Sequence, residues 1–364
     1  MKKDNLLSND KTAPIAVPLF AVLIGLLAGA LIMACLGYNP LTAYMNLLQG
    51  CGILPKPTYA GYKSMLTDFT SFLNALTPMI FAALSVAVAF KAGLFNIGVS
   101  GQMLAAGFIS TLIVGYSSLS AGIAKPLALL IGLVVGAIVG GLIGFLKYKF
   151  NINEVVSSIM LNYIAQYIIS FFIKTQYVDP ISRQSKAISA SSRWTMMNTE
   201  IGNLKIDIPL AFPLAVIAAV CVYFLVKKTT LGYEIKTVGM SRTAAQYAGI
   251  KVGKTMIFSM LISGALAGLA GITYYMGYYG SIQPGVLPSM GFDAIAVSLL
   301  GNSNPIGVLF SSFMITTISK GSTYMSSTSG VQAEIVSVIT GIILLFSACS
   351  AYIRYIAKRR KEDK

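Results

Sequence analysis

Apolar stretches recur along the whole chain, each of the length (about 20 residues) that crosses the hydrocarbon core of a bilayer. Hydrophobic residues make up 55% of the 364 residues and charged residues only 11%, too little charge to cover a soluble protein of this size. Because lipid offers no partners to free backbone groups, apolar stretches of this length fold as helices. The sequence therefore predicts an all-α integral membrane protein.

Hydropathy predicts about ten transmembrane helices, some of them short or broken. They are expected at 14–37, 69–90, 93–116, 126–146, 152–173, 207–226, 255–278, 289–301, 304–319 and 331–353. The spans 289–301 and 304–319 are short, so eight crossings plus a re-entrant pair is the alternative. The first span follows Lys2, Lys3 and Lys11, and its length favours an uncleaved helix over a signal peptide that ends near Cys35.

The basic residues predict the orientation of these spans. The net charge is +15, and 18 of the 27 Lys and Arg residues fall in 1–13, at Lys91, and in 147–151, 227–254 and 354–364. The positive-inside rule places these segments in the cytoplasm, with both termini inside, so the charge needs no nucleic acid to explain it. The expected organisation is a cytoplasmic tail 1–13, a membrane domain 14–353 and a basic tail 354–364. The outer segments 38–68 and 174–206 are expected to be solvated connectors.

Residues 93–103, "GLFNIGVSGQM", contain glycine and hydrogen-bonding residues where lipid offers no partners. Irregular backbone at membrane depth is tolerated only inside protein or beside a water-filled cavity. We therefore expect a helix break that lines a solute path. The residue types leave open whether Asn96 and Gln102 contact the solute or only brace the break.

Two acidic residues, Glu154 and Asp293, lie in or at the ends of apolar spans. A charge at the bilayer centre costs about 2.5–3.5 kcal/mol or more, so each carboxylate must pair, face water or lie near an interface. A helix-start role is the alternative for both. Amides such as Asn153 and Asn162 suit a neutral solute, although hydrogen bonding between helices also explains them. The candidate solute-path residues are Asn96, Ser100, Gln102, Asn153, Glu154, Asn162, Phe292, Asp293 and Asn302.

A tyrosine cluster occupies "ITYYMGYYG", at the expected outer end of span 255–278. Trp and Tyr gather at membrane interfaces, so an aromatic belt is expected, with a surface for base stacking as the alternative. In the same span "GALAGLAG" (264–271) repeats small residues every four positions, which predicts close helix packing.

Several functions are excluded by the sequence. The chain has no histidine, which excludes a Ser-His-Asp hydrolase and histidine metal sites. "GIKVGKT" has one residue too few between its glycines for a phosphate-binding loop. The four cysteines have no paired spacing. We therefore expect no enzyme activity, metal or cofactor in this chain, and an energy source in an ion gradient or another polypeptide.

The long inner segment, 227–254, predicts a short helix. Ser241 suits an N-cap, "RTAAQYA" favours helix, and Gly249 suits the position after the helix. Such a helix would present Ala244, Ala245, Tyr247 and Ala248 to the cytoplasm. In a chain without its own energy source, this favours a docking element for a motor subunit.

Four motifs, "GLFNIGVSGQM", "NEVVSSIMLNYIA", "RTAAQYAGI" and "GFDAIAVSLLGNSNPIG", together resemble the permeases of bacterial ABC importers. The superfamily contains the ribose and branched-chain amino acid permeases, and the likeness is greatest to simple-sugar and nucleoside permeases that work with Bmp-type lipoproteins. The motifs occur in the family's order and cover about residues 70–350. Many members have an acidic residue where this chain has Ser100.

The resemblance implies a permease in the bacterial cytoplasmic membrane that pairs with a second permease. It favours a paralogue of this chain as that second permease. It also implies ABC ATPase subunits, which carry ATP and Mg, and an extracellular substrate-binding lipoprotein that delivers a small neutral solute. The coupling helix would comprise Ser241, Arg242, Ala244, Ala245, Tyr247 and Gly249.

These features predict a permease subunit that imports nucleosides by alternating access. The alternatives are an ABC permease for a simple sugar such as ribose or galactose, and a secondary transporter that uses Glu154 or Asp293 as its ion site.

Overall fold

A computed structural model describes residues 13–349 of the chain. Its helices are α1 (Ala13–Cys35), α2 (Pro40–Gly50), α3 (Met65–Lys91), α4 (Val99–Ser110), α5 (Ala121–Phe150), α6 (Glu154–Phe172), α7 (Phe212–Lys228), α8 (Thr230–Met240), α9 (Arg242–Tyr247), α10 (Val252–Ile272), α11 (Met290–Leu300), α12 (Pro305–Ser329) and α13 (Ala333–Ala348). Three helices continue into π-helical turns, η1 (Thr111–Gly115), η2 (Ile173–Tyr177) and η4 (Thr273–Tyr279), and a 3₁₀ turn η3 spans Ala190–Ser192. Strands β1 (Thr195–Ile201) and β2 (Leu204–Pro209) form an antiparallel hairpin.

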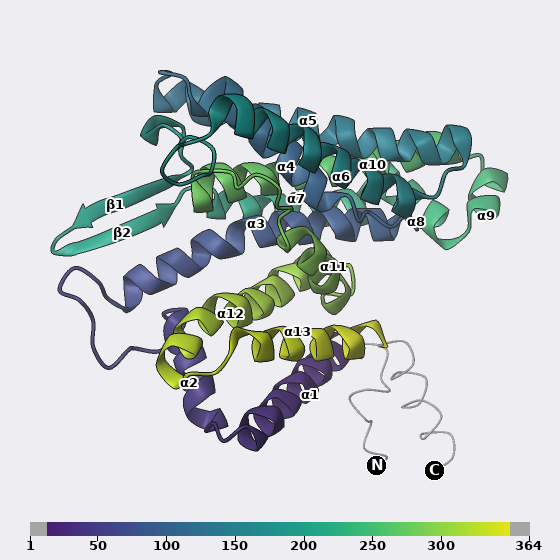
Figure 1. The fold of residues 1–364 in the computed structure, drawn as a ribbon. Coiled ribbons are helices and arrows are strands. Elements are labelled where there is room, and N and C mark those ends of the chain that lie inside the picture. The colour runs from purple at the N-terminus through teal and green to yellow at the C-terminus, as the bar shows by residue number, and fades with distance from the viewer. Residues whose placement is uncertain (1–12, 350–364) are drawn as a thin grey trace, which may run out of the picture.

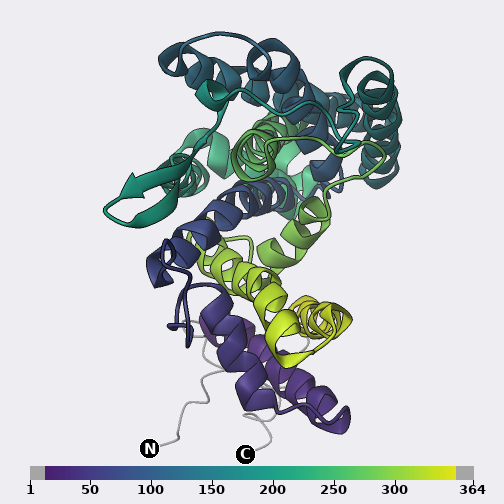
Figure 2. The same ribbon diagram turned by 60° about the vertical axis from the view of Figure 1, so that its left-hand side comes forward.

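The helices form two groups that pack on one another. In Figures 1 and 2, α4, α5, α6, α7 and α10 lie on one side of α3, and α1, α2, α12 and α13 lie on the other. Helix α3 contacts α10 in the first group and α12 in the second, and α11 packs against α3, α12 and α4. The hairpin and α9 lie at opposite ends of the molecule (Figure 1).

The burial of the helices fits a membrane protein. In the most apolar stretch of α3, 94% of the residues are buried, whereas in those of α5 and α6 only 33% are. Exposed Leu, Ile and Phe side chains along α5 and α6 face outward. An apolar surface of this kind is stable against lipid, so α3 forms the centre and α5 and α6 the periphery.

By length and composition, the described residues contain four helices suited to cross a membrane: Met65–Lys91, Ala121–Phe150, Glu154–Tyr177 and Val252–Tyr279. A fifth results if α7 and α8, bent by 72° at their junction, count as one span. Shorter apolar helices fall at Leu19–Cys35, Val99–Gly115, Met290–Leu300 and Glu334–Ser347, within predicted spans. The fold is thus mostly helical with four or five clear spans, and the count of ten stays a prediction.

Three predicted segments differ from the structure. The connector 38–68 contains α2, and the connector 174–206 contains β1, so a purely helical fold is wrong in that detail. The span predicted to end at residue 319 continues as α12 to Ser329. Hydropathy misses its Ser/Thr-rich second half because hydroxyls score as polar, yet Ser322 and Ser327 donate to carbonyls of their own helix. The tails 1–12 and 350–364 lie outside the described residues.

Glycines let α5 and α10 pack backbone to backbone, as the small-residue pattern predicts. A Cβ on Gly136 would collide with the carbonyl oxygen of Gly264 and lie 2.7 Å from the Cα of Gly268. Gly140 is equally close to α10, since a Cβ there would lie 2.7 Å from the Cα of Gly264. Without hydrophobic driving force between helices in lipid, such close approach supplies much of the packing energy.

Gly136→Val is therefore expected to destabilise the fold strongly, because the obstacle is backbone and overpacking a tight contact costs about 1–3 kcal/mol or more. Gly122→Val is the matched control, since Gly122 lies in the same helix with open space around its Cα. Thermal unfolding of both variants in detergent checks this. A Gly136→Val protein that melts with the wild type would contradict the packing account.

Candidate functional site

The predicted helix break is present between α3 and α4. The chain leaves the helix after Lys91, turns at Gly93 with a φ of +67°, and resumes helix at Val99. The Asn96 Nδ2 donates to Gln102 Oε1 (3.1 Å) and to Ser263 Oγ (2.8 Å), and its Oδ1 accepts from the amide of Gly98 (3.0 Å). These side chains are fully buried. The break is thereby joined to α10 through Ser263.

Two further residues hold the break to its neighbours. Asn162 Oδ1 accepts from the amide of Gly101 (2.8 Å), and its Nδ2 donates to the carbonyl of Ile97 (3.0 Å), which fastens the break to α6. Ser100 Oγ donates to the carbonyl of Pro288 (2.8 Å), just before α11. In this structure the side chains of Asn96, Ser100, Gln102 and Asn162 (the Asn96 cluster) are buried and hydrogen-bond to protein groups, so they brace the break.

Four other predicted solute-path residues lie away from this cluster. Asn153 caps α6 by accepting from the amide of Val155 (2.9 Å), and Glu154 pairs with Lys147 (2.9 Å). Asn302 is exposed in the turn after α11 with a φ of +55°, and the Phe292 side chain is 45% exposed. The structure therefore gives Asn153 and Glu154 roles at a helix start.

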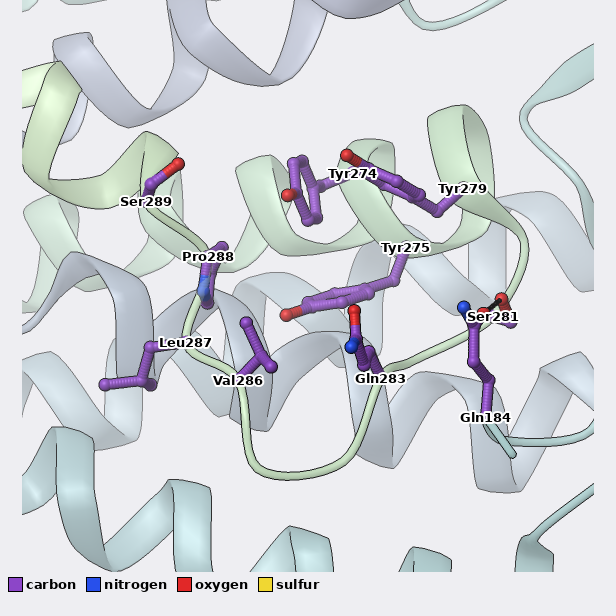
Figure 3. Close-up of a pocket in the computed structure, with 10 residues that line it drawn as sticks. All are labelled: Gln184, Tyr274, Tyr275, Tyr279, Ser281, Gln283, Val286, Leu287, Pro288 and Ser289. Atoms are coloured by element: carbon purple, nitrogen blue, oxygen red, sulfur yellow. Dashed lines mark hydrogen bonds between the residues drawn. The ribbon is translucent and has the colours of Figure 1, made fainter. Parts of the chain in front are cut away.

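Asp293, the remaining candidate, faces one of two adjoining cavities beside η4. The amide cavity, about 240 Å³, is lined by Gln184, Tyr274, Tyr275, Tyr279, Ser281, Gln283, Val286, Leu287, Pro288 and Ser289 (Figure 3). The charged cavity, about 260 Å³, is lined by Ala75, Met79, Tyr274, Tyr278, Tyr279, Ser289, Met290, Asp293, Thr316, Ser319, Lys320 and Thr323. Tyr274, Tyr279 and Ser289 line both, so the cavities meet between α3, η4, α11 and α12.

The π-helical winding of η4 gathers its tyrosines around these cavities. A π-helix hydrogen-bonds each residue to the one five positions on, which keeps such a pair on about the same face, and the rings of Tyr274 and Tyr279 lie 4.8 Å apart between centroids. The rings of Tyr274 and Tyr275 are 5.0 Å apart and nearly perpendicular. Tyr275 is only 5% exposed. An interfacial belt is thus wrong for Tyr275, because its ring lies inside the protein.

The charged cavity contains an acid and a base that do not pair. Among the described residues, the Asp293 carboxylate takes part in no ion pair and accepts no side-chain or backbone hydrogen bond. Lys320 Nζ instead donates to the hydroxyl of Tyr278 (3.0 Å) and lies 5.1 Å from the centre of its ring. Burying a carboxylate without a partner costs free energy in an apolar protein. Because the Asp293 oxygens accept no hydrogen bond from the described residues, a ligand in the cavity could donate to them.

Sequence reasoning missed Lys320 and Gln184. Lys320 lies one residue past the predicted span 304–319, and the signal that marks it is a lone lysine in a Ser/Thr-rich helix. Gln184 lies in the strap 178–194, which crosses the ends of α4 and α10. Further along the strap, the backbone amides of Ser189 and Trp194 donate to the carbonyls of Gly115 and Met276. No local pattern marks such a residue, because only the tertiary fold brings it to the cavity.

At the opposite end of the molecule, the predicted capping of α9 is confirmed. Ser241 Oγ accepts from the amide of Ala244 (3.2 Å), and Gly249 has a φ of +78°. Arg242, Ala244 and Tyr247 are exposed, Tyr247 by 90%. Ala245 is wrong as a docking residue, because it is fully buried against a hydrophobic cluster that includes Ile235, Met256 and Met260.

Helix α8, which the sequence did not predict, links α9 to the break. Thr229 Oγ1 caps it by accepting from the amide of Gly232 (3.1 Å). Near its end, Gly239 lies against the turn after α3, where a Cβ on Gly93 would be 3.1 Å from the Gly239 Cα. The backbone of the α8–α9 segment therefore touches the same turn that leads into the Asn96 cluster.

Several known transport proteins are similar in sequence to this chain over nearly its full length. The chain is 36% identical to the nucleoside ABC transporter permease protein NupB of Lactococcus lactis subsp. cremoris, over 98% of this chain and 96% of NupB. It is 36% identical to the guanosine ABC transporter permease protein NupP of Bacillus subtilis, over 95% and 96% of the two chains. The glucose ABC transporter permease protein TsgB13 of Haloferax volcanii is 29% identical, over 93% of this chain and 88% of TsgB13.

Residues 69–348 also match the family described as the branched-chain amino acid transport system permease component. The match runs from the first turns of α3 to the end of α13 and includes the break, both cavities and the α8–α9 segment. The chain therefore belongs to the family of branched-chain amino acid transport system permease components.

Proposed function

We propose that this chain is the permease subunit of an ATP-driven ABC importer for nucleosides, and that the solute passes through the two cavities beside η4. The observation that carries the proposal is the tyrosine-lined charged cavity, where Asp293 and Lys320 face the same space without pairing. Its chemistry suits a neutral solute with an aromatic part and several hydroxyls. The similarity to NupB and NupP, both named as nucleoside or guanosine permeases, supports the same solute class.

The physical chemistry of the lining favours a nucleoside. Stacking of a base on an aromatic side chain contributes about 1–3 kcal/mol and tolerates any base. A carboxylate accepts hydrogen bonds from hydroxyls, and charge-assisted bonds are about twice as strong as neutral ones. Aromatic rings and an unpaired carboxylate in adjoining cavities therefore complement a base and a ribose in one molecule.

Alternating access would use both ends of the chain. The strap contributes Gln184 to the amide cavity, whereas α9 lies at the end of the molecule opposite the hairpin (Figure 1). The buried Asn96 cluster would lie on the route between the cavities and the cytoplasm. In the proposed cycle, solute enters the cavities from outside, and ATP binding on partner subunits moves α9 and α8. The contact of Gly239 with Gly93 passes this motion to the break, which opens the inner route.

The proposed assembly places the α8–α9 segment on the cytoplasmic face of the bacterial cytoplasmic membrane, with about ten crossings and both termini inside. Three expected inner segments support this orientation, because they meet at one end. Gly93 touches Gly239, and a Cβ on Gly253 would collide with Tyr148. The partners would be an ABC ATPase that carries ATP and Mg, a second permease that is a paralogue, and an extracellular substrate-binding lipoprotein.

A free sugar is the second candidate, because the polar groups of the charged cavity could bind it without help from the amide cavity. Asp293, Lys320, Ser319 and Thr323 would bind a hydroxyl-rich solute without an aromatic part. The resemblance to TsgB13, named as a glucose permease, supports the same alternative.

Uptake assays separate these candidates. Cells that express the chain with its partners are expected to accumulate radiolabelled guanosine, and a catalytically inactive ATPase partner should abolish accumulation. An ionophore should leave short-term uptake intact, because the ion gradient is not the energy source. Uptake of ribose or glucose but of no nucleoside would show that the solute is a sugar. Uptake that persists after ATPase inactivation but stops with the ionophore would overturn the proposal of an ATP-driven importer.

A further inference from the structure

We propose that the two adjoining cavities bind the two halves of one nucleoside, with the base in the amide cavity and the ribose in the charged cavity. This inference rests on the proposed function and deepens it by assigning residues to each half of the solute. The inference is based on the different residues that line the two cavities. The carboxamides of Gln184 and Gln283 line the amide cavity, and the charged groups of Asp293 and Lys320 line the charged cavity.

The amide cavity has the groups that recognise a base edge. Gln184 Oε1 accepts from Ser281 Oγ (2.5 Å), which orients this carboxamide and leaves its Nε2 free to donate. Gln283 makes no side-chain hydrogen bond within the described part of the chain, and its amide lies beside the Tyr275 ring (Figure 3). A carboxamide offers one acceptor and two donors, the same complement that base edges present.

The walls of the amide cavity suit a flat ring. Tyr275 and Tyr279 provide aromatic surface, and Val286, Leu287 and Pro288 provide the apolar side (Figure 3). Ser281 is the only hydroxyl besides Ser289 and the tyrosines among the residues that line it. No charged group of residues 13–349 lines the amide cavity, so a ribose hydroxyl there would not gain the charge-assisted hydrogen bond that Asp293 offers in the other cavity.

The charged cavity has the groups that recognise a sugar. The Asp293 carboxylate can accept one hydrogen bond at each oxygen, which matches two neighbouring hydroxyls of a ribose. Lys320, Ser319, Thr316 and Thr323 add donors around it. A site built to hydrogen-bond a hydroxyl rejects the analogue that lacks it, because the buried polar group is then left unpaired.

The residues that line both cavities mark the boundary between them. Tyr274 and Tyr279 line both cavities, and their rings are 4.8 Å apart and inclined by 54°. Ser289 lies at the same boundary, one turn of α11 before Asp293. A solute that reaches both Gln283 and Asp293 must cross this boundary, so the base and the sugar occupy different cavities.

The test is a double dissociation with the complete transporter in proteoliposomes, supplied with saturating solute-loaded lipoprotein. Initial uptake rates are measured for guanosine, inosine, which lacks the 2-amino group, and 2′-deoxyguanosine, which lacks one ribose hydroxyl. Ratios of these rates within one preparation are independent of how much of a variant folds. The lipoprotein is unchanged throughout, so its own preferences cancel between variants.

Asp293→Asn is expected to bring the guanosine to 2′-deoxyguanosine ratio at least fivefold closer to one and to leave the guanosine to inosine ratio unchanged. Gln184→Leu and Gln283→Leu are expected to do the opposite. Glu200→Gln in the exposed hairpin is the matched control and should change neither ratio.

Three outcomes overturn the assignment. They are the reversed pattern, the same fractional loss for all three solutes in every variant, and a wild-type transporter that does not distinguish the two sugars. Failure of the proposed function is distinguishable, because the wild-type transporter would then carry no nucleoside at all.

Discussion

Tyr247→Glu is expected to reduce ATP-driven uptake at least tenfold while the permease stays folded. Tyr247 is 90% exposed at the end of α9, so the permease loses little when its ring is replaced. If α9 docks into an ATPase groove, the new carboxylate would be buried there without a partner, which costs several kcal/mol. The measurements are uptake and the amount of ATPase that copurifies with the permease.

Tyr247→Phe is the matched control and should retain uptake, because it keeps the ring and adds no charge. Full uptake by Tyr247→Glu would refute docking through this residue. Ala245→Arg does not serve the same purpose. Ala245 is fully buried, so its substitution would disrupt the cluster with Ile235 and Met260 as well as any interface.

Gly239→Val is expected to separate ATP hydrolysis from transport. A Cβ on Gly239 would collide with the carbonyl oxygen of Lys91 and lie 3.0 Å from the amide nitrogen of Gly93. Valine must therefore push α8 away from the turn that leads into the break, while α9 stays exposed for docking. Solute transported per ATP hydrolysed should fall at least tenfold, and hydrolysis itself should continue.

Gly341→Val provides the comparison, because a Cβ at Gly341 in α13 meets no atom within 4 Å. The ratio of solute to ATP is measured for both variants in proteoliposomes. An unchanged ratio in Gly239→Val would show that motion reaches the break by another route.

Local patterns predicted the features that depend on neighbouring residues. The long apolar stretches became α3, α5, α6 and α10, and Ser241 caps α9 as its residue type indicates. The glycines of "GLFNIG" correctly marked a helix break, because the residue type reflects a backbone demand that does not depend on distant partners.

Partners far apart in the chain were not predictable. Asn96 bonds to Ser263, and Gly101 to Asn162, across 167 and 61 residues. The sequence therefore shows that a polar residue in an apolar stretch needs a hydrogen-bond partner, but it does not identify that partner. Whether Asn96 meets solute or protein depends on the packing of α4 against α10 and α6, which a single sequence does not encode locally.

The sequence did not predict the charged cavity, because two of the helices that form it depart from what hydropathy predicts. A helix of 3.6 residues per turn would turn Tyr274 and Tyr279 away from one another, whereas the π-helical η4 brings their rings to 4.8 Å between centroids. Lys320 was missed because hydropathy ends the span at residue 319, although α12 continues to Ser329 with hydroxyls that donate to carbonyls of their own helix. Both errors come from treating helix geometry and length as functions of hydropathy alone.

Uptake by Asp293→Asn is the most direct test of the claim that solute passes through the charged cavity. Proteoliposomes that contain the complete transporter would be supplied with ATP and radiolabelled guanosine, with Glu200→Gln as the control for loss of an acidic group. A hydrogen bond to a charged group contributes about 1.5–3 kcal/mol, so guanosine uptake should fall about tenfold to a hundredfold in Asp293→Asn. The control should match the wild type. Wild-type uptake by Asp293→Asn, in a transporter that assembles normally, would contradict the account.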